Sequence, residues 1–306
     1  LGERNAVSCG SIEHKMGIKA SATCVMNFDG AKGFMVGAEN TGLASMFSMM
    51  NYERLTMGLQ GIGGAELAYQ NATAYTLDRI QGRADSGIQE PNKAADPIVF
   101  HADVRRMLLN AKTISEASRC FAMYVAKELD TNKYTDDAAA RKAADDRVAL
   151  LTPVAKAFLT DRGLEASIDA QQCFGGHGYI REWGMEQIVR DTRISQIYEG
   201  TNGIQSLDLL GRKVVKNGGA FVTTYVQEMR DFANNMNADH AIKQAILTSA
   251  DKLEDLTKAV VAAAAVNKDE INGCAVDYLQ AFGYVSFAYM FGLMVEAANG
   301  KEGDFY

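Results

Sequence analysis

The sequence predicts a mainly α-helical fold, in which a helical bundle follows a short β-rich segment and precedes a further set of helices. Apolar residues recur near a 3.6-residue period over long stretches after residue 40, as they do in amphipathic helices. Only three prolines occur in 306 residues and the last is Pro153, so proline interrupts no helix beyond that point. Hydrophobic residues form 47% of the chain, enough for one sizeable core or for two domains.

Charge and hydropathy argue against two classes of partner. The net charge is −7, and the densest basic spot is Arg105-Arg106, so no basic stripe could neutralise a row of phosphates. We therefore expect no nucleic-acid binding. The longest apolar run, Ala259–Val266, is too short to span a bilayer, and no charged-then-apolar leader opens the chain. We expect a cytoplasmic protein that does not bind membranes.

The cysteines predict neither a disulfide framework nor a zinc site. They are odd in number and widely scattered, which is typical of reduced thiols that act as small, mostly buried hydrophobes. The nearest approach to a metal-ligand pair is Cys173 and His177, but two glycines lie between them and no second pair exists. We expect no metal. The five cysteines are Cys9, Cys24, Cys120, Cys173 and Cys274.

The first 38 or so residues are rich in glycine and in β-forming residues. The runs Ala22–Phe28 and Phe34–Val36 flank a turn that contains Asp29-Gly30, which predicts a hairpin between those two runs.

A long helix is predicted from about 41 to 83. Four glycines inside it each cost about 1 kcal/mol relative to alanine, which suggests that another backbone or a ligand comes very close. Tight helix packing alone explains them equally well. The glycines are Gly58, Gly61, Gly63 and Gly64, and the apolar face is Leu55, Ile62, Ala65, Tyr69, Ala72 and Ile80.

The rest of the chain predicts further helices joined by modest loops. Asp85–Asp96 is expected to be a loop, with Pro97 at the first position of the next helix. Helices are expected at about 97–130, 137–161 and 164–173, followed by three helical segments between about 221 and 298, with breaks near Asn234-Asn235 and at Asn267–Gly273.

The glycine-rich stretch Gly175–Tyr179 could serve a ligand or only a turn. It follows a predicted helix and not a strand, so it lacks the context of a dinucleotide-binding fingerprint. Its backbone N–H groups could approach an anion or a flat ring, or the glycines could merely let the chain turn. On this loop alone the turn is the favoured interpretation.

Arg54 and Arg79 are separated by 25 residues of the same predicted helix. They share a face but lie ~37 Å apart, so they cannot hold one small molecule within one subunit. They could contact two ligands, or one long ligand across a dimer, and ordinary surface ion pairs are the alternative.

Glu199 stands in the stretch QIYEGTNGIQ, between Tyr198 and Gly200. A carboxylate in an apolar pocket is disfavoured as the anion, which would raise its pKa and make it a usable base. From these residues alone, a helix cap or a salt bridge remains the commoner role for such a glutamate.

Three blocks of sequence carry a resemblance to a known family. The first runs from Glu53-Arg54-Leu55 to Tyr75-x-x-x-Arg79-x-Gln81-Gly82, the second is Gln172–Tyr179, and the third joins Arg190-Asp191 to Ile197–Thr201 and Ile204-Gln205. In order and spacing, over about 150 residues, they resemble the acyl-CoA dehydrogenases, flavoenzymes that introduce a double bond between Cα and Cβ of an acyl-coenzyme A.

The resemblance implies an organisation of the chain. Residues 1–40 are expected to be the incomplete end of a middle β-domain, 41–215 the carboxyl-terminal helical bundle with the flavin and substrate motifs, and 216–306 a helical extension. The chain then looks like a fragment that lacks the amino-terminal half. Lys15–Lys19 and Met49–Arg54 resemble a long bacterial branch of the family that includes 3-(methylthio)propanoyl-CoA dehydrogenases.

Site residues follow from the resemblance, position by position. Glu199 matches the catalytic base, whereas Glu53 stands where some relatives carry the base instead and is expected to pair with Arg54 or another nearby charge. The positions that match substrate contacts are Asn51, Arg54, Tyr198 and Gly200, and those that match flavin contacts are Arg79, Gln172, Gly175, Gly176 and Thr201.

The implied activity is FAD-dependent α,β-dehydrogenation of an acyl-CoA. Glu199 would remove a proton from Cα while a hydride leaves Cβ for flavin N5, giving the trans-2-enoyl-CoA. The resemblance implies electron-transfer flavoprotein as the acceptor, a homodimer or homotetramer, and 3-(methylthio)propanoyl-CoA or a fatty acyl-CoA as candidate substrates. Two alternatives stay open: an acyl-CoA oxidase that uses oxygen, and a non-catalytic helical oligomerisation module.

Overall fold

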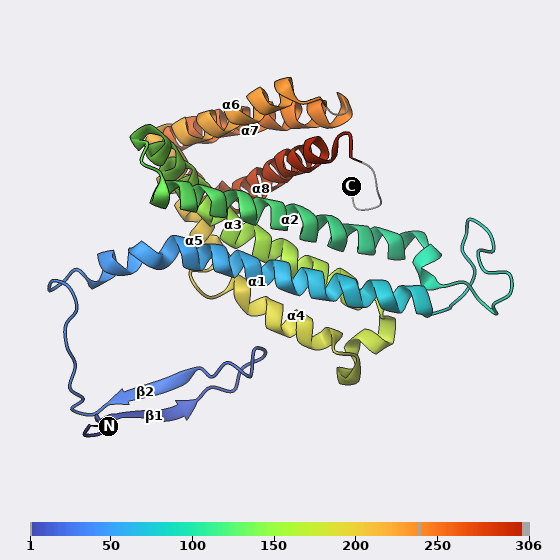
Figure 1. The fold of residues 1–306 in the computed structure, drawn as a ribbon, viewed down its shortest axis with the longest axis horizontal. Helices are drawn as coiled ribbons and strands as arrows, with labels where there is room; N and C mark the ends of the chain where they lie inside the picture. Colours follow the sequence, from blue (N-terminus) through green and yellow to red (C-terminus); the bar gives the residue numbers. More distant parts are fainter. Residues whose placement is uncertain (1, 238–239, 302–306) are drawn as a thin grey trace.

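The computed structural model describes residues 2–237 and 240–301, and within them the fold is a helical bundle. Three long helices form the bundle: α1 (Gly42–Asp78) and α3 (Ala138–Cys173) run parallel to each other, and α2 (Ala102–Tyr134) runs antiparallel to both (Figure 1). The short helices α4 (Met185–Arg193) and α5 (Asn202–Leu207) pack beside them. The predicted mainly α-helical fold is confirmed.

Glycines let α1 and α3 approach with their backbones in contact. A methyl group at Gly58 would lie 2.8 Å from the carbonyl oxygen of Ala155, and one at Gly61 would lie 2.7 Å from that of Leu159. Such distances are too short for any side chain, so the glycines are needed for helix packing. Gly63 differs, because a methyl group there would meet nothing within 4 Å.

The helix α3 corrects one prediction. Residues 137–161 and 164–173 were expected to form two helices, but α3 continues from Ala138 to Cys173 without a break. Gly163, in the gap expected between those two helices, lies inside α3 and faces the backbone of Gly61. Gly163 lets α1 and α3 approach closely, and it does not end the helix.

The loop between α1 and α2 is built around the buried carboxylate of Asp96. Burial alone would raise the pKa of this carboxyl, but the backbone N–H groups of Glu90, Ala84 and Gln89 and the Arg83 guanidinium lower it to about 2. Two boundaries expected here were wrong. The first helix ends at Asp78 and not near 83, and Pro97 precedes a 3₁₀ turn, Ile98–Phe100, before α2 begins at Ala102.

The predicted hairpin exists, but one of its strands lies elsewhere. Strand β2 (Cys24–Phe28) pairs antiparallel with β1 (Val7–Ile12), and not with Phe34–Val36. After the turn, the side chain of Asn5 holds the chain by bonding both backbone groups of Lys32 (2.8 and 2.9 Å). Pairing therefore stops, and Phe34 is 97% exposed.

The hairpin is attached to the helices at the end of α4. The backbone N–H of Ile18 donates to Asp191 Oδ1 at 2.6 Å, and Arg190 donates to the carbonyl oxygen of Met16 at 2.6 Å. Gly17 lies between these two contacts, where a side chain would collide with Arg190 and Asp191. The chain must therefore have glycine at this point.

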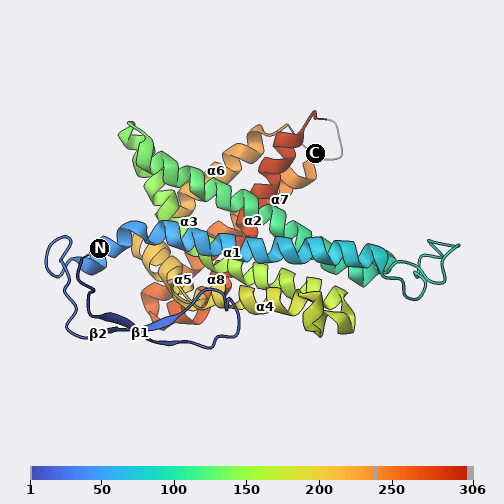
Figure 2. The same ribbon diagram turned by 60° about the horizontal axis from the view of Figure 1, so that its bottom comes forward.

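The carboxyl-terminal helices lie across the bundle on the side away from the hairpin (Figures 1 and 2). They are α6 (Ala220–Asn235), α7 (His240–Val266) and α8 (Asp269–Ala298), preceded by a π-helical turn at Asp208–Val214. The breaks predicted near Asn234-Asn235 and Asn267 are confirmed, although Gly273 lies inside α8. Residues 302–306 of the predicted extension fall outside the described residues.

A polar cluster joins this extension to the bundle. The carboxylate of Glu228 on α6 accepts hydrogen bonds from Tyr124 on α2 and Tyr289 on α8 and from Arg147 on α3. Arg147 also pairs with Glu128 at 3.2 Å. Four helices thus meet at one carboxylate.

Helix α8 is long and apolar enough, by length and composition, to cross a bilayer, and 39% of its most apolar window is buried inside the protein. Its buried residues, among them Tyr278, Leu279 and Phe282, belong to the main hydrophobic core.

The cysteines are all free, but most are not buried as expected. Only Cys173 is fully buried, whereas Cys9 and Cys24 are exposed on the hairpin and Cys120 and Cys274 are half-buried. The hairpin has no covering layer among the described residues, so its cysteines remain accessible.

Candidate active site

Glu199 lies at the tip of a tight turn between two short helical segments. Its backbone has φ +56°, a left-handed conformation that is uncommon for a residue with a side chain, and Gly200 follows with φ +81°. Thr201 then caps α5, its Oγ1 accepting from the backbone N–H of Ile204 at 3.4 Å. Two successive left-handed residues turn the chain sharply and leave the Glu199 side chain exposed.

Hydrogen bonds of Gln205 and Tyr198 stabilise this turn on its two sides. Gln205 is fully buried, and its Nε2 donates to the carbonyl oxygens of Glu199 (3.4 Å) and Gly200 (3.3 Å). A methyl group at Gly200 would lie 2.6 Å from that nitrogen, so only glycine fits. On the other side, the Tyr198 hydroxyl donates to Gln60 Oε1 on α1. Strain of the kind seen at Glu199 persists only where neighbours over-determine the backbone, as they do here.

The surroundings of Glu199 among the described residues rule out the helix-cap and salt-bridge roles, and they differ from the apolar pocket that was expected. Among the described residues its carboxylate has no ion pair or hydrogen-bond partner, and the helix cap is Thr201, so Glu199 is neither a cap nor a salt-bridge partner there. We expected an apolar pocket around it. Instead the carboxylate is exposed, and its apolar neighbours Ile197 and Ile204 are 46% and 54% exposed. An apolar enclosure is not formed by this part of the chain.

Two cationic side chains, Arg54 and Lys156, contact residues that follow the turn, and Lys156 was not predicted from the sequence. Arg54 on α1 pairs with Asp208 at 3.1 Å, and its Nε is buried without a partner. Lys156 on α3 is fully buried and donates to Asn202 Oδ1 at 2.8 Å. Burial lowers the pKa of the Lys156 ammonium to about 8, against the opposing effect of the Asp161 and Glu199 carboxylates. The available signal was a single lysine inside the apolar run of residues 150–159.

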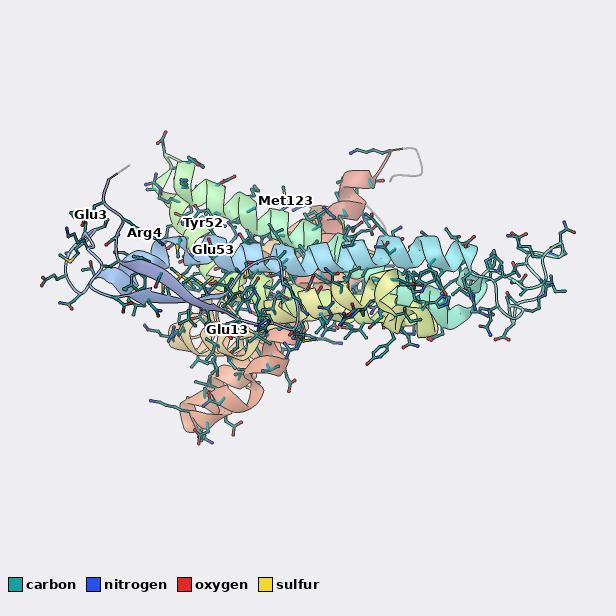
Figure 3. The ribbon with its side chains drawn as sticks, turned by 90° about the horizontal axis from the view of Figure 1, so that it is seen from below. Glu3, Arg4, Glu13, Tyr52, Glu53 and Met123 are labelled. Atoms are coloured by element: carbon teal, nitrogen blue, oxygen red, sulfur yellow. The ribbon has the colours of Figure 1, made fainter. Side chains whose placement is uncertain are left out.

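Asn51 and Glu53 lie near Arg54 in the first half of α1, and both are half-buried. Figure 3 shows Tyr52 and Glu53 at the end of α1 near which the hairpin lies. The expected pair between Glu53 and Arg54 is not formed, because the partner of Arg54 is Asp208.

A second group of predicted residues meets at the other end of α1. Arg79, Gln172, Gly175 and Gly176 line one cavity of about 660 Å³, between the end of α1, the start of α2 and the end of α3. Arg79 is exposed, Gly175 has φ +56°, and a methyl group at either glycine would meet open space. Among the residues that the structure describes, no carboxylate lines this cavity. A cation, amides and bare backbone suit an anionic diphosphate with an attached flat ring.

Three aromatic side chains, Tyr75, Phe174 and His177, line this cavity, and their grouping was not predicted from the sequence. The Tyr75 hydroxyl is 2.9 Å from His177 Nδ1, and Tyr75 stacks on Phe174 with ring centroids 4.0 Å apart. His177 stacks in turn on Trp183, at 4.4 Å. Phe174 and His177 belong to the second block and Trp183 follows it, but Tyr75 belongs to the first block, so their spacing in the sequence did not show that they meet.

The side chains of Cys173 and His177, the candidate metal pair, have other interactions. His177 Nδ1 is shared with Tyr75, and burial raises the pKa of the Cys173 thiol to about 11, so the thiolate that a metal would need is disfavoured. Within residues 2–237 and 240–301, no three His, Cys, Asp or Glu side chains group closely enough to hold a metal ion.

The two sites are well separated. Tyr198, next to Glu199, bonds Gln60, which lies 19 residues before Arg79 on the same helix, or ~28 Å along its axis. One small ligand cannot reach both ends.

Comparison with known proteins gives concordant matches. The family model described as "Acyl-CoA dehydrogenase, C-terminal domain" matches residues 40–214. A second, described as "Acetyl-CoA dehydrogenase C-terminal like", matches residues 225–306. The bundle and the extension are therefore each similar to a known kind of domain.

One curated relative and two solved structures extend the similarity to almost the whole chain. The 3-methylmercaptopropionyl-CoA dehydrogenase of Ruegeria pomeroyi is 37% identical over 306 residues, which cover 98% of this chain and 51% of that protein. The chain thus spans about half the length of this relative. Caenorhabditis elegans ACDH-11 in complex with C11-CoA has a TM-score of 0.78 at 19% identity, covering 97% of this chain and 47% of that one. Bacillus anthracis acyl-CoA dehydrogenase complexed with FAD has a TM-score of 0.73 at 20% identity, covering 98% and 52%.

Proposed function

The chain belongs to the acyl-CoA dehydrogenase family, and on that premise we propose that it forms part of an FAD-dependent enzyme that oxidises an acyl-CoA to the trans-2-enoyl-CoA. One observation carries the proposal: Glu199 is held in a strained, braced turn with an exposed and unpartnered carboxylate. Strain of this kind clusters at functional sites.

Glu199 is assigned the role of catalytic base. Its carboxylate accepts the proton from Cα of the thioester and becomes a carboxylic acid, because no described group competes for its oxygens. FAD, when bound, supplies the acceptor for the hydride that leaves Cβ. Gly200 and Tyr198 shape the turn from which the carboxylate projects, so their contact with substrate would lie beside the reacting carbons.

The flavin assignment rests on the cavity at Arg79. Its guanidinium can bind phosphate oxygens, while Gln172 and the backbone of Gly175 and Gly176 can donate further hydrogen bonds. Thr201 lies beside Glu199 and not in this cavity, so we assign it to the flavin that a partner chain's Arg79 cavity holds. Its hydroxyl hydrogen can donate, because its oxygen accepts the hydrogen bond that caps α5.

Substrate contacts are assigned to Asn51 and Arg54. The buried Nε of Arg54 has no partner, so a donor remains available although the guanidinium also pairs with Asp208. The coenzyme A moiety is anionic and suits such a donor. For the acyl group we propose 3-(methylthio)propanoyl or a fatty acyl chain, since the relative of 37% identity is named for 3-methylmercaptopropionyl-CoA.

The separation of the two sites supports a homodimer or a homotetramer. Within one chain, the Arg79 cavity lies ~28 Å along α1 from the residue that bonds Tyr198. A partner chain that brings its own Arg79 cavity to this Glu199 would complete each active site. We further propose electron-transfer flavoprotein as the electron acceptor and a cytoplasmic location.

Anaerobic titration of the holoenzyme with butyryl-CoA, octanoyl-CoA and 3-(methylthio)propanoyl-CoA, followed by loss of flavin absorbance, tests the proposal. Wild type should be bleached, and Glu199→Gln should bind FAD without bleaching. Glu53→Gln is the matched control and should retain bleaching, because Glu53 is assigned no proton transfer. Bleaching that survives Glu199→Gln but not Glu53→Gln would transfer the base to Glu53. A holoenzyme that binds no flavin contradicts the proposal, and rapid reoxidation in air identifies an oxidase.

A further inference from the structure

Asp161 on α3 collects hydrogen bonds from three separate parts of the chain. Its Oδ1 accepts from Gln196 Nε2 at 2.7 Å and from Asn202 Nδ2 at 2.6 Å. Its Oδ2 accepts from Gln280 Nε2 at 2.6 Å. Both carboxylate oxygens are therefore occupied by amide donors, and the short distances are typical of hydrogen bonds to an ionised acceptor.

Two of these donors enclose Glu199 in the sequence. Gln196 stands three residues before it and Asn202 three residues after it. Both ends of the turn are thus tied to the same carboxylate on α3. Since the backbone of Glu199 is strained, the position of its side chain depends on how firmly these two ends are held.

Asn202 is fixed on every side. Its Nδ2 also lies within hydrogen-bond distance of the carbonyl oxygen of Ala157 (3.2 Å) and of Thr160 Oγ1 (3.0 Å). Its Oδ1 accepts from the buried ammonium of Lys156. The amide therefore has one orientation, in which Nδ2 faces the carboxylate of Asp161 and Oδ1 faces Lys156.

The third donor comes from the extension. Gln280 lies on α8, 119 residues along the chain from Asp161. Its Oε1 is buried and has no hydrogen-bond partner. An apolar residue would avoid this unfavourable burial, so packing alone does not explain a glutamine at this point. Its hydrogen bond to Asp161 does.

We propose that the carboxyl-terminal extension positions the catalytic turn: Gln280 of α8 orients Asp161, which holds Gln196 and Asn202 and through them the carboxylate of Glu199. Gln280 is a positioning residue, because it acts through Asp161 and touches no reacting atom. The inference rests on the proposed role of Glu199. It implies that the extension influences the rate of proton abstraction by Glu199.

The test compares Gln280→Leu with Tyr284→Phe in the holoenzyme. The leucine is close in size to glutamine but cannot donate to Asp161. Tyr284 lies one turn further along α8, and its hydroxyl receives a hydrogen bond from Arg162, the neighbour of Asp161. Tyr284→Phe therefore removes a polar contact between the same two helices and leaves the bonds of Asp161 intact.

Two readouts are taken for each variant. The first is the rate of anaerobic flavin bleaching against concentration of butyryl-CoA and 3-(methylthio)propanoyl-CoA. Gln280→Leu should lower the maximal rate about 10-fold, because a small misplacement of the base is costly, while the half-saturating concentration and the flavin content stay unchanged. The second is hydrogen exchange of residues 196–206, which should become faster in Gln280→Leu. Tyr284→Phe should change neither.

The outcomes separate this inference from the proposed function. An unchanged bleaching rate in Gln280→Leu overturns the inference, as does an equal loss in both variants together with a lower melting temperature. If no acyl-CoA bleaches the wild-type flavin, the proposed function fails, and exchange alone decides: unchanged exchange of residues 196–206 in Gln280→Leu then overturns the positioning role. Should Gln280→Leu not fold, Asp161→Asn removes an acceptor from the same network and must give the same pattern.

Discussion

A methyl group built on Gly163 of α3 would overlap the carbonyl oxygen of Gly61 on α1, so the two helices cross with their main chains in contact. Both the turn of Glu199 and the Arg79 cavity are built on these two helices. The crossing therefore sets the distance between the elements that carry the two sites.

Gly163→Ala is expected to destabilise the protein by about 1–3 kcal/mol, because the added methyl group must push the helices apart. Gly63→Ala is the control on the same pair of helices. A methyl group there meets open space, so the better helix propensity of alanine should stabilise the protein by about 1 kcal/mol. Denaturant unfolding measures both changes, and a stability loss of similar size in the two variants would show that the crossing is not the cause.

Glu199→Gly should increase stability while it abolishes flavin reduction. A left-handed backbone costs a residue with a side chain about 1–2 kcal/mol and costs glycine almost nothing, although glycine gains freedom in the unfolded chain. We expect a net gain of about 1 kcal/mol in the free energy of unfolding. Glu199→Gln retains the side chain and hence the strain, so its stability should match wild type. A glycine variant no more stable than the glutamine variant would mean that the turn is unstrained.

Arg79→Gln should weaken flavin binding about 10- to 100-fold, the effect of losing a charge-assisted hydrogen bond to phosphate. Arg119→Gln removes an exposed guanidinium that pairs with Glu66 on a different part of the bundle, and it should leave flavin affinity unchanged. Fluorescence titration of the apoprotein with FAD measures both dissociation constants. Equal affinities for wild type and Arg79→Gln would remove this cavity from the cofactor site.

Asp96 predicts a defined pH dependence of stability. Its pKa is lowered to about 2 in the fold from its usual 3.8, so the stability that it contributes is complete above about pH 4 and is lost as the pH falls through about 2. Asp96→Asn should therefore be less stable than wild type at neutral pH, with a difference that shrinks below pH 4.

Denaturant midpoints between pH 2 and pH 6 measure this difference. Asp85→Asn, at an exposed position of the same loop, should follow wild type over the whole range. A difference between Asp96→Asn and wild type that stays constant down to the most acid pH would contradict the assignment.

Local features could be predicted from the sequence because their causes lie close together in the chain. The 3.6-residue period gave the long helices, and the glycines of α1 indicated that a backbone approaches closely, as it does at Gly58 and Gly61. Four of the five residues expected to bind flavin also meet, since Arg79, Gln172, Gly175 and Gly176 line one cavity, whereas Thr201 caps α5 at the other site. Their roles remain predictions.

Several of the errors concern partners that are distant in sequence. The strand Cys24–Phe28 pairs with residues that precede it, and no local pattern could show this, because the Asp-Gly turn pointed to Phe34–Val36. Gly163 lies in the gap expected between two helices, yet it continues α3, and its role depends on Gly61 in another helix. Gln280 is a further case, since its partner Asp161 belongs to a different domain of the predicted organisation.

The attachment of the hairpin has a consequence for biosynthesis. Met16 and Ile18 are made before the residues that hold them, since Arg190 and Asp191 follow 174 and 173 positions later. At about 5–20 residues per second, a ribosome needs roughly 9 to 35 s to cover that interval. During that interval the nascent segment around Gly17 lacks its contacts with Arg190 and Asp191, and the thiols of Cys9 and Cys24 in the same hairpin are exposed.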